Sequence, residues 1–343
     1  KNSTEVEGPE FIYQFSTTAS LLAGSGINAF SEGTGAAAQF NYPTGIVRDA
    51  SGNFFVADRD NHRIRKITPA GVVTTFAGSG VAGFVNGTTT AAQLNQPYGI
   101  TMDGSGNLFV ADRINHAIRK ITAAGVVTTI AGNGNPGATN GTGAAATFWE
   151  PLNLAVDVSG NVFVADYRNY VIRKITPAGV VSTFAGTTGS SGFSNGTGTS
   201  ASFSGTFGIT IDGSGNLFVG DHQNSCIRKI TPAAVVTTVA GIGTQGWHDG
   251  RVDSAQFFNP TQLIADAAGN IYVSDTYNNR IRMITSTGQV ITLAGTGSAG
   301  YVEGAGTSAQ INFPIGITGD FENNDLFICD FQNHRIRKLH LNL

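Results

Sequence analysis

The sequence predicts an all-β protein that folds as a six-bladed β-propeller of four-stranded antiparallel blades. Three observations lead to this prediction: one unit recurs six times at intervals of 54 or 55 residues, the composition suits tight turns, and the first segment supplies a strand that the last unit lacks. A repeat of this length is typical of folds in which each unit packs against its neighbours.

The composition favours strands joined by tight turns. Of 343 residues, 46 are glycine, 41% are hydrophobic and only 13% are charged. Gly adopts a positive φ without strain, whereas long amphipathic helices need more Glu, Lys and Arg. The net charge of −3 and the absence of a basic stripe argue against a nucleic-acid partner. No apolar run reaches about 18 residues, so we expect no membrane span.

The repeat gives the blade boundaries. Each unit opens with a bulky apolar residue, and these residues are Phe40, Leu94, Phe148, Phe203, Phe257 and Ile311. In the first unit, short strands are expected at residues 45–48, 54–57, 63–67 and 72–76. The strand at 54–57 is apolar on both faces, as are most of its counterparts. A sheet with two apolar faces has to lie between two neighbouring sheets, and blades arranged around an axis provide this.

The two ends of the chain are expected to close the ring as one domain, residues 1–343. Residues 18–24 match the fourth strand of a unit, and the last unit ends after its third strand, residues 335–339. We therefore predict that residues 12–24 form the outer strand of the last blade, which removes an open sheet edge. Residues 1–11 have no counterpart in the repeat and form an N-terminal extension.

A family resemblance rests on one motif. Asp-x-x-Asn-His-Arg-Ile-Arg-Lys spans residues 58–66, and it is echoed from Asp112, Asp166, Asp221, Asp275 and Asp330. This motif resembles the NHL repeat, and the resemblance covers essentially the whole chain. It implies a propeller that serves as an interaction platform, although a minority of such propellers resemble lyases or sensor domains.

The acidic residues of the repeat are interpreted as structural. One series precedes the first turn of each unit and the other follows the second strand: Asp49, Asp103, Asp157, Asp212, Asp266 and Asp320, then Asp58, Asp112, Asp166, Asp221, Asp275 and Asp330. Oxygen-rich turns can bind Ca²⁺. Because both series occur in all six units, we expect each Asp to cap its own turn by accepting backbone N–H bonds.

The basic residues of the repeat have a similar interpretation. The arginines at one position, Arg65, Arg119, Arg173, Arg228, Arg282 and Arg337, are expected to tie the third strand to a neighbouring turn or carboxylate. Four histidines, His62, His116, His222 and His334, fall in the turns between the second and third strands. Because a sixfold arrangement spreads these turns around a rim, we expect no metal or other cofactor there. Cys226 and Cys329 occupy different repeat positions, so no disulfide is expected between them.

Departures from the repeat concentrate in blades three to five and mark a candidate binding patch. They replace small or amide residues, fill one turn between the second and third strands, or lie in one loop between blades; the residues are Trp149, Glu150, Asn153, Tyr167, Arg168, Tyr170, Trp247, His248 and Gln262. Exposed aromatic rings beside carboxylates and amides suit a sugar or a peptide. The alternative is that Trp149 and Trp247 only pack loops against the blades.

Three classes of function remain open. A non-catalytic binding scaffold for a protein or carbohydrate ligand is favoured, because a rigid face lowers the ordering cost of association. A self-assembling subunit, a homo-oligomer or filament joined through residues 1–11, is the second class. A lyase-like enzyme is the third, although no catalytic set stands out. Low Lys, low Cys and abundant Thr, Ser and Asn favour an extracellular or periplasmic location.

Overall fold

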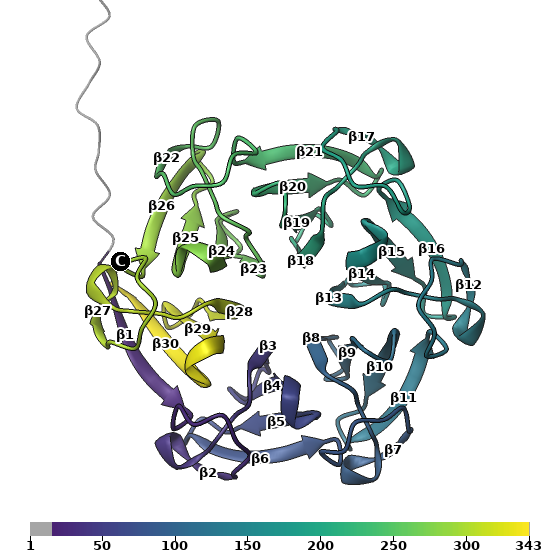
Figure 1. Cartoon of the computed structure of the whole chain (residues 1–343), viewed down its shortest axis with the longest axis horizontal. Helices are drawn as coiled ribbons and strands as arrows, with labels where there is room; N and C mark the ends of the chain where they lie inside the picture. Colours follow the sequence, from purple (N-terminus) through teal and green to yellow (C-terminus); the bar gives the residue numbers. More distant parts are fainter. Residues whose placement is uncertain (1–15, 343) are drawn as a thin grey trace, which may run out of the picture.

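The structure, a computed structural model, describes residues 16–342. Six antiparallel sheets stand around a central axis, so the prediction of an all-β six-bladed propeller is confirmed (Figure 1). The inner four strands of blades 1 to 3 are β3 (Pro43–Arg48), β4 (Phe54–Asp58), β5 (Arg63–Ile67) and β6 (Val72–Ala77); β8 (Pro97–Met102), β9 (Leu108–Asp112), β10 (Ala117–Ile121) and β11 (Val126–Ala131); and β13 (Pro151–Val156), β14 (Val162–Asp166), β15 (Val171–Ile175) and β16 (Val180–Ala185).

Blades 4 to 6 repeat this order from the axis outward. Their inner four strands are β18 (Thr206–Ile211), β19 (Leu217–Asp221), β20 (Cys226–Ile230) and β21 (Val235–Ala240); β23 (Leu263–Ala265), β24 (Ile271–Asp275), β25 (Arg280–Ile284) and β26 (Gln289–Ala294); and β28 (Pro314–Asp320), β29 (Asp325–Asp330), β30 (Arg335–Asn342) and β1 (Ser16–Ala23). The innermost strand of blade 5 is the shortest of its kind.

Each blade has five strands, not the four that the sequence predicts. The fifth is a two-residue strand on the outer edge: β2 (Gly33–Thr34), β7 (Gly87–Thr88), β12 (Gly141–Thr142), β17 (Gly196–Thr197), β22 (Gly250–Arg251) and β27 (Gly304–Ala305). It belongs to the loop that enters the blade, and it pairs with that blade's outer long strand, as Gly33 does with Val73. The loop thereby covers a sheet edge whose backbone groups would otherwise face solvent.

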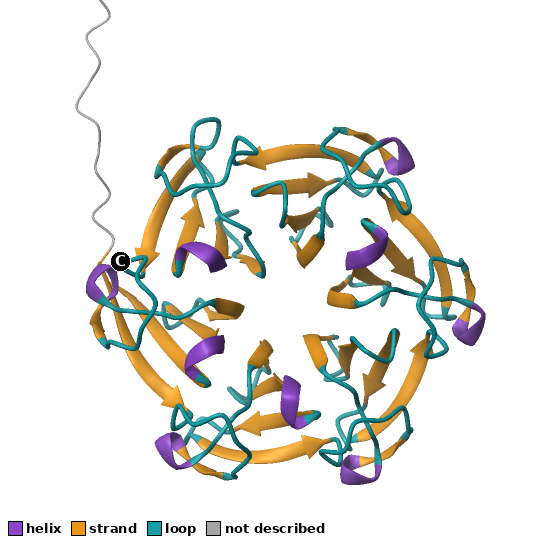
Figure 2. Ribbon diagram, in the orientation of Figure 1, coloured by secondary structure: helices purple, strands orange, loops and turns teal. Residues whose placement is uncertain are grey.

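Short 3₁₀ helices complete the repeat. Among the described residues, four form turns between the second and third strands and five lie in the entering loops; the first group lies near the axis and the second at the perimeter (Figure 2). The first group is η2 (Arg59–Asn61), η5 (Tyr167–Asn169), η7 (Thr276–Asn278) and η9 (Phe331–Asn333), and the second is η1 (Gly35–Ala37), η3 (Thr89–Ala91), η4 (Gly143–Ala145), η6 (Gly198–Ser200) and η8 (Gly306–Ser308).

The predicted closure of the ring is confirmed. Strand β1 lies between β30 and β27 in blade 6, so segments from the two ends of the chain lie side by side (Figure 1). It pairs antiparallel with β30 from Ser16 opposite Asn342 to Ala23 opposite Ile336. The described strand lies within the predicted range of 12–24. The N-terminal extension, residues 1–11, lies outside the described residues.

Apolar side chains fill the spaces between blades. The cluster between blades 1 and 2, for example, contains Phe55, Ile64, Leu94 and Val110. Near the axis the blades approach so closely that their backbones touch. A Cβ atom added to Gly99 would lie 2.5 Å from the carbonyl oxygen of Leu152 in the next blade. This contact explains why most units carry Gly at that position.

A buried ion pair holds each blade together, as the arginine series predicts. In blade 1, Nη1 of Arg65 lies 2.8 Å from Oδ2 of Asp58, and neither side chain is exposed. Nη2 of Arg65 also donates to the carbonyl oxygen of Ser31, in the entering loop. The other five pairs are Asp112–Arg119, Asp166–Arg173, Asp221–Arg228, Asp275–Arg282 and Asp330–Arg337.

The two acidic series differ in what they bond. Asp49 accepts the backbone N–H of Asn53 in its own turn, at 2.8 Å, as predicted. For Asp58 the predicted cap is wrong, because its Oδ1 accepts the backbone N–H of Asn41, which precedes the first strand of the blade. With Arg65 on its other oxygen, Asp58 joins three segments of the blade, which a turn cap would not do.

Three of the histidines connect neighbouring blades through backbone hydrogen bonds. Nδ1 of His62 accepts from the backbone N of Gln96 at 3.1 Å, and His116 and His334 do the same for Glu150 and Tyr42. Burial lowers the pKa of all three, which keeps Nδ1 free to accept. At the equivalent position in blade 5, Oδ1 of Asn279 accepts the backbone N–H of Phe313. The histidines therefore act as interblade contacts. Cys226 and Cys329 are buried free thiols.

Candidate functional site

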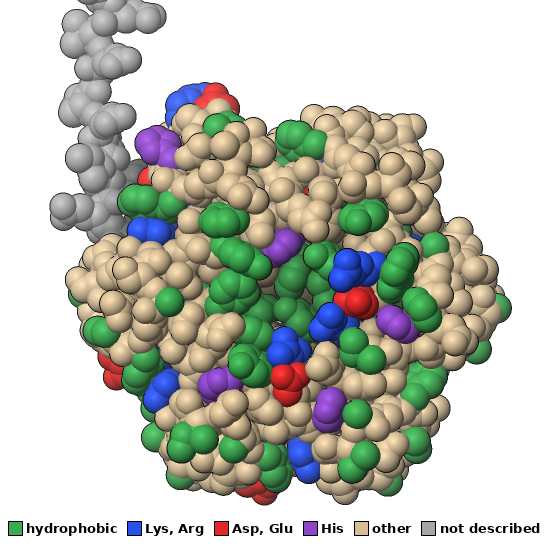
Figure 3. Space-filling model, viewed as in Figure 1, with side chains coloured by type: hydrophobic (Ala, Val, Ile, Leu, Met, Phe, Trp, Pro, Cys, Tyr) green, Lys and Arg blue, Asp and Glu red, His purple; other side chains and the backbone are tan. Residues whose placement is uncertain are grey.

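A pocket of about 360 Å³ opens at the axis of the propeller, on the face that carries the turns between the second and third strands. In the space-filling view this face is hollowed at its centre, where hydrophobic side chains gather with charged side chains along one side (Figure 3). Every blade contributes to the wall, so residues far apart in sequence meet here. The volume suits a small ligand.

Two positions of the repeat supply much of the wall. The first is the residue after the buried Asp: Arg59, Arg113, Tyr167, His222, Thr276 and Phe331. The second is the second residue of the innermost strand or of its equivalent: Thr44, Tyr98, Leu152, Phe207, Thr261 and Ile315. All but Thr276 and Thr44 line the pocket. The flanking Asp and Asn are the same in all six blades, whereas these positions differ from blade to blade.

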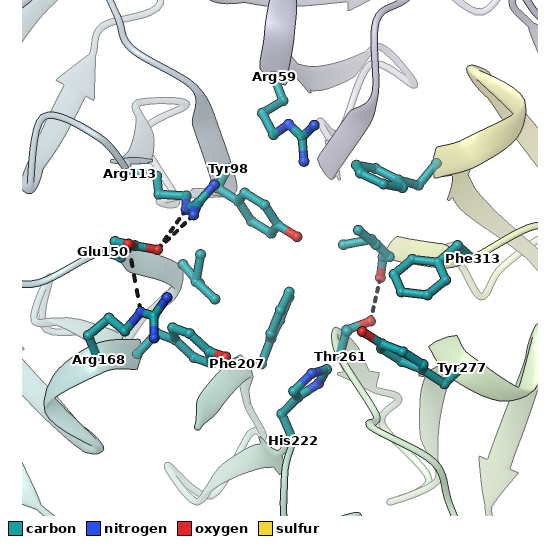
Figure 4. A pocket seen from close by; sticks show the side chains of 14 residues that line it. Arg59, Tyr98, Arg113, Glu150, Arg168, Phe207, His222, Thr261, Tyr277 and Phe313 are labelled. Atoms are coloured by element: carbon teal, nitrogen blue, oxygen red, sulfur yellow. Dashed lines mark hydrogen bonds and ion pairs between the residues drawn. The ribbon is translucent and has the colours of Figure 1, made fainter. Parts of the chain in front are cut away.

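One side of the pocket is charged. Nη2 and Nε of Arg113 both donate to Oε2 of Glu150, at 2.7 and 3.1 Å. Nε of Arg168 lies 3.7 Å from Oε1 of the same carboxylate (Figure 4). Arg59 forms a two-pronged ion pair with Asp60 and lies over the ring of Phe331, 4.8 Å from its centroid. Glu150 therefore orients two arginines at the mouth of the pocket.

The other side is mostly aromatic. The rings of Tyr277 and Phe313 meet edge to face at 4.6 Å between centroids, and Phe207 lies 5.5 Å from Tyr98 (Figure 4). Such pairs are stable when the edge of one ring meets the face of another. Burial raises the pKa of Tyr98 above its usual range, so its phenol stays neutral. This wall offers flat apolar contact with few charges.

His222 is a neutral polar group within the aromatic wall. Burial lowers its pKa to about 4, so the imidazole is uncharged at neutral pH. Its Nδ1 lies 3.3 Å from the carbonyl oxygen of Pro260 and its ring lies 5.0 Å from that of Phe207. Since a carbonyl oxygen accepts, Nδ1 carries the proton and Nε2 is left as an acceptor.

Three residues of the sequence-predicted patch, Glu150, Tyr167 and Arg168, line this pocket. Tyr167 and Arg168 belong to η5, and Glu150 lies in the segment before β13 with φ at 50°. The backbone N of Arg168 donates to the carbonyl oxygen of Trp149, which joins the two segments. The structure brings together the part of the patch that comes from blade 3.

The two tryptophans lie outside the pocket wall. Trp149 is 45% exposed and Trp247 is 48% exposed. The ring of Trp247 stacks on Arg280 at 3.9 Å, and its Nε1 donates to Thr292. Phe30 with Arg63 and Tyr301 with Arg335 make the same stack in blades 1 and 6, at 3.9 and 3.8 Å. Trp247 therefore occupies a repeat position that also carries an aromatic residue in blades 1 and 6. His248 is the next residue along the chain.

The remaining predicted residues also lie away from the pocket wall. Asn153 is buried, and its Oδ1 accepts the backbone N–H of Leu154. Gln262 is buried too, and its Oε1 has no hydrogen-bond partner among the described residues. Tyr170 ends η5 in the left-handed conformation, at the position where three other blades carry histidine. None of these three shares the wall with Glu150.

Sequence reasoning missed most of the pocket because it searched for blades that differ rather than for positions that differ. Arg59, Arg113 and His222 each follow the constant Asp of the repeat directly. Within six aligned units, this column changes in almost every copy between constant neighbours. That variation is a signal visible in the sequence, and it would have identified one ring of the wall.

We looked in the described part of the chain for side-chain clusters that could bind a metal ion and for helices that could span a membrane. Among residues 16–342, no group of three or more His, Cys, Asp or Glu side chains could hold a metal ion. Within the same range, no helix is long and apolar enough to cross a membrane.

Comparison with known proteins relates the chain to NHL-repeat proteins. The family model for the NHL repeat matches residues 40–67. The chain is 29% identical over 289 residues to the Arabidopsis thaliana chloroplastic protein SUPPRESSOR OF QUENCHING 1, covering 79% of this chain and 27% of that protein. It is 28% identical to NHL repeat-containing protein 2 of Bos taurus, covering 88% and 46%. The chain thus spans between about a quarter and a half of the relatives it matches.

Solved structures share the fold at low sequence identity. An auxiliary nutrient binding protein from Bacteroides ovatus superimposes with a TM-score of 0.72 and 18% identity, covering 97% of this chain and 78% of that one. Virginiamycin B lyase from Staphylococcus aureus superimposes with a TM-score of 0.57 and 14% identity, covering 96% and 100%. At these identities the likeness concerns the fold, which serves both binding proteins and enzymes.

Proposed function

The chain is a six-bladed β-propeller of the NHL-repeat family, and from that premise we propose that it is a non-catalytic binding scaffold whose ligand occupies the axial pocket. The pocket lies on the face formed by the turns between the second and third strands and the entering loops. A rigid ring of blades holds the wall in one arrangement, which lowers the ordering cost of binding.

One observation carries the proposal: the positions that vary among otherwise matching blades come together at one place. The column of Arg59, Arg113, Tyr167, His222 and Phe331 lies directly beside the constant buried Asp. A residue needed only for folding would be the same in each blade, as the Asp and Arg are. Different side chains at equivalent positions make an asymmetric wall, which a specific ligand requires.

The proposed site narrows the patch that the sequence indicated. Tyr167 and Arg168 are assigned to the ligand directly, and Glu150 is assigned to the wall beside them, where it orients the arginines. Trp149, Trp247 and His248 are assigned to the outer part of the same face, where a longer ligand would extend. Asn153, Tyr170 and Gln262 are assigned to the frame around the site. A small organic molecule, a sugar or a peptide end would fit this arrangement of rings, charges and neutral polar groups.

We also propose an extracellular or periplasmic location. The chain is rich in Thr, Ser and Asn, and Lys and Cys are few. A protein that shares the fold is called an auxiliary nutrient binding protein, so the fold is compatible with a binding role. Fractionation of the native host, with antibody detection, tests the location.

Binding measurements on two double variants test the site. Ligand-observed NMR with sugars, short peptides and small organic molecules first identifies ligands of the unaltered protein. We expect Tyr167→Ala/Tyr277→Ala to abolish their binding, because both rings line the pocket. The matched control, Trp149→Ala/Trp247→Ala, removes two exposed rings outside it and should bind small ligands unchanged. Binding lost in the control and kept in the pocket variant would overturn the axial site.

Self-assembly through residues 1–11 stays a prediction, since these residues lie outside the described range. Light scattering of the full chain and of a chain lacking residues 1–11 distinguishes the two cases. If both chains have the mass of their monomer, assembly through this segment is excluded.

A further inference from the structure

The axial pocket carries an excess of positive charge in a chain whose formal net charge is −3. Its wall includes Arg59, Arg113 and Arg168 but a single carboxylate, that of Glu150. His222 adds no charge at neutral pH, because burial holds its pKa at about 4. The wall therefore favours an anion, and the three arginines differ in how much of that attraction they can offer.

Two of the three arginines are already occupied. The Nε and Nη2 atoms of Arg59 bond both oxygens of Asp60. Arg113 gives Nε and Nη2 to Glu150 and Nη1 to Gln96. Within residues 16–342, Arg59 still has free N–H groups on Nη1, but in both residues a carboxylate at hydrogen-bond distance balances the positive charge, so neither attracts a further anion strongly.

Arg168 is the arginine of the wall that has no carboxylate of residues 16–342 at hydrogen-bond distance. Its one ion-pair contact is through Nε, 3.7 Å from Oε1 of Glu150, and half of its side chain is exposed. Among the described residues, neither terminal nitrogen has a hydrogen-bond acceptor. The guanidinium lies 5.5 Å from the centroid of the Tyr167 ring, and η5 fixes the backbone beneath both residues. Two parallel N–H groups at the end of an oriented guanidinium match the geometry of a carboxylate.

The aromatic wall supplies the second half of a recognition site. Phe207, Tyr277 and Phe313 line the pocket together with Arg168 (Figure 4). Among these, Tyr277 and Phe313 form an edge-to-face pair that leaves ring surface toward the cavity. A flat ring can lie against such surfaces with favourable apolar contact, whereas a second charged group on that side would lose its hydration without compensation.

We propose that the axial pocket binds a small organic anion in which a planar ring carries a carboxylate side group. The carboxylate accepts from the two terminal nitrogens of Arg168, and the ring lies against Phe207, Tyr277 and Phe313. This assignment rests on the proposed function and adds the class of ligand to it. Glu150 acts as a positioning residue that orients Arg168 and keeps Arg113 from competing.

Matched acid and amide probes test the assignment. The unaltered protein is titrated by calorimetry with indole-3-acetate and indole-3-acetamide, and with phenylacetate and phenylacetamide, at constant ionic strength because salt screens ion pairs. At least one acid should bind about tenfold or more tightly than its amide, which is the range expected for a hydrogen-bonded charge pair. Arg168→Ala should bring the affinity of the acid to that of the amide.

The matched control is Arg251→Ala, which removes an arginine from an entering loop, where its one ion-pair partner within residues 16–342 is the exposed Asp253. This variant should keep the preference for the acid. Thermal unfolding of each variant excludes loss of folding as a cause.

Failure of this inference can be told apart from failure of the axial site itself. Equal binding of acid and amide, or an acid preference that survives Arg168→Ala, would overturn the anion assignment while leaving a neutral-ligand pocket. If none of the four probes binds at millimolar concentration, the assignment is also wrong. If, in addition, the ligands found by NMR still bind Tyr167→Ala/Tyr277→Ala, the axial site falls too.

Discussion

The interior of the blades and the wall of the axial pocket are built from the same repeat but follow opposite rules. Within the blades, six buried Asp–Arg pairs recur with N–O distances between 2.6 and 3.0 Å. One residue further along the chain, Arg59, Arg113, Tyr167, His222, Thr276 and Phe331 are almost all different. The Asp and Arg residues are constant because each blade packs the same buried ion pair in the same surroundings. Variation is tolerated at the axis, where the side chains face a cavity instead of a core.

Removal of the closing strand should have the largest effect on folding. A chain that begins at Gly24 lacks β1, which exposes the long edge of β30 and uncovers Leu339 and Leu341. Because an open edge and an unfilled core both favour association, we expect loss of cooperative unfolding and aggregation. Circular dichroism during heating, with light scattering, measures both.

A circularly permuted chain tests whether β1 stabilises the ring wherever it stands in the sequence. Residues 24–342 followed by an Asn-Gly turn and then residues 16–23 would form the last blade as a hairpin, since Ser16 already pairs with Asn342. This chain should unfold cooperatively like the original. A truncated chain that stays monomeric and as stable as the original would contradict the structural role of closure.

Breaking one constant pair should cost more than removing a variable residue. Asp112→Ala leaves Arg119 charged and fully buried without its carboxylate, for an expected loss of about 3–5 kcal/mol. Arg168→Ala removes a half-exposed arginine and should cost no more than about 1 kcal/mol. Urea unfolding gives both values. Similar losses for the two variants would remove the distinction between frame and site.

Contacts between blades at the axis can be tested with a pair of glycines. The Cβ atom of Gly99→Ala would lie 2.5 Å from the carbonyl oxygen of Leu152, so two backbones must separate at a cost of about 2 kcal/mol. Gly104, in a turn of the same blade, has nothing within 4 Å of such an atom. Gly104→Ala should change stability by about 0.5 kcal/mol or less. Equal effects in urea unfolding would show that the blades can shift freely.

The interblade histidines should make a small pH-dependent contribution. Burial lowers the pKa of His62, His116 and His334 in the folded protein, so the unfolded chain binds more protons below its own pKa of about 6.5. Their contribution is complete above that pH. It falls with decreasing pH until the folded pKa is passed, because a protonated Nδ1 cannot accept. The expected loss is about 0.5 kcal/mol per histidine.

Replacing these histidines with Asn distinguishes the effect of histidine protonation on stability from the effect of protonating the nearby carboxylates. Asn279 already accepts the equivalent backbone N–H in blade 5. The triple variant His62→Asn/His116→Asn/His334→Asn should therefore lose less stability between pH 7.5 and 5 than the unaltered protein does in urea unfolding. Both proteins share the charges that face the histidines, chiefly Asp60, Arg63, Arg113, Glu150 and Arg335. An identical pH profile for the two would contradict the assignment.

The sequence was sufficient for the fold because the repeat is long and regular. The spacing gave the number of blades, and the unmatched segments at residues 18–24 and 335–339 gave the closure. The fifth strands could not be predicted, because two residues such as Gly33 and Thr34 carry no strand pattern. They pair with the sheet only because the chain must cross its outer edge on the way to the axis.

The site was only partly predictable. Rare residues drew attention to Trp149 and Trp247, yet the side chain of Trp247 stacks on Arg280 just as Phe30 does on Arg63. In five of the six blades the residue that follows the buried Asp lines the pocket, and it lies in a turn that ends in a left-handed residue, such as His62 with φ at 52°. No single residue type in the turn predicts that backbone conformation. It becomes apparent when the six units are superimposed.

The antiparallel pairing of β1 with β30 also determines how the molecule would respond to tension. Ser16 lies opposite Asn342, so a force applied to the two ends of the described chain acts on a single pair of adjacent residues. The load would open the β1–β30 ladder one hydrogen-bonded pair at a time, while the other blades carry none of it. The ring would thus yield first at its seam, and at low force, because unzipping breaks bonds in sequence.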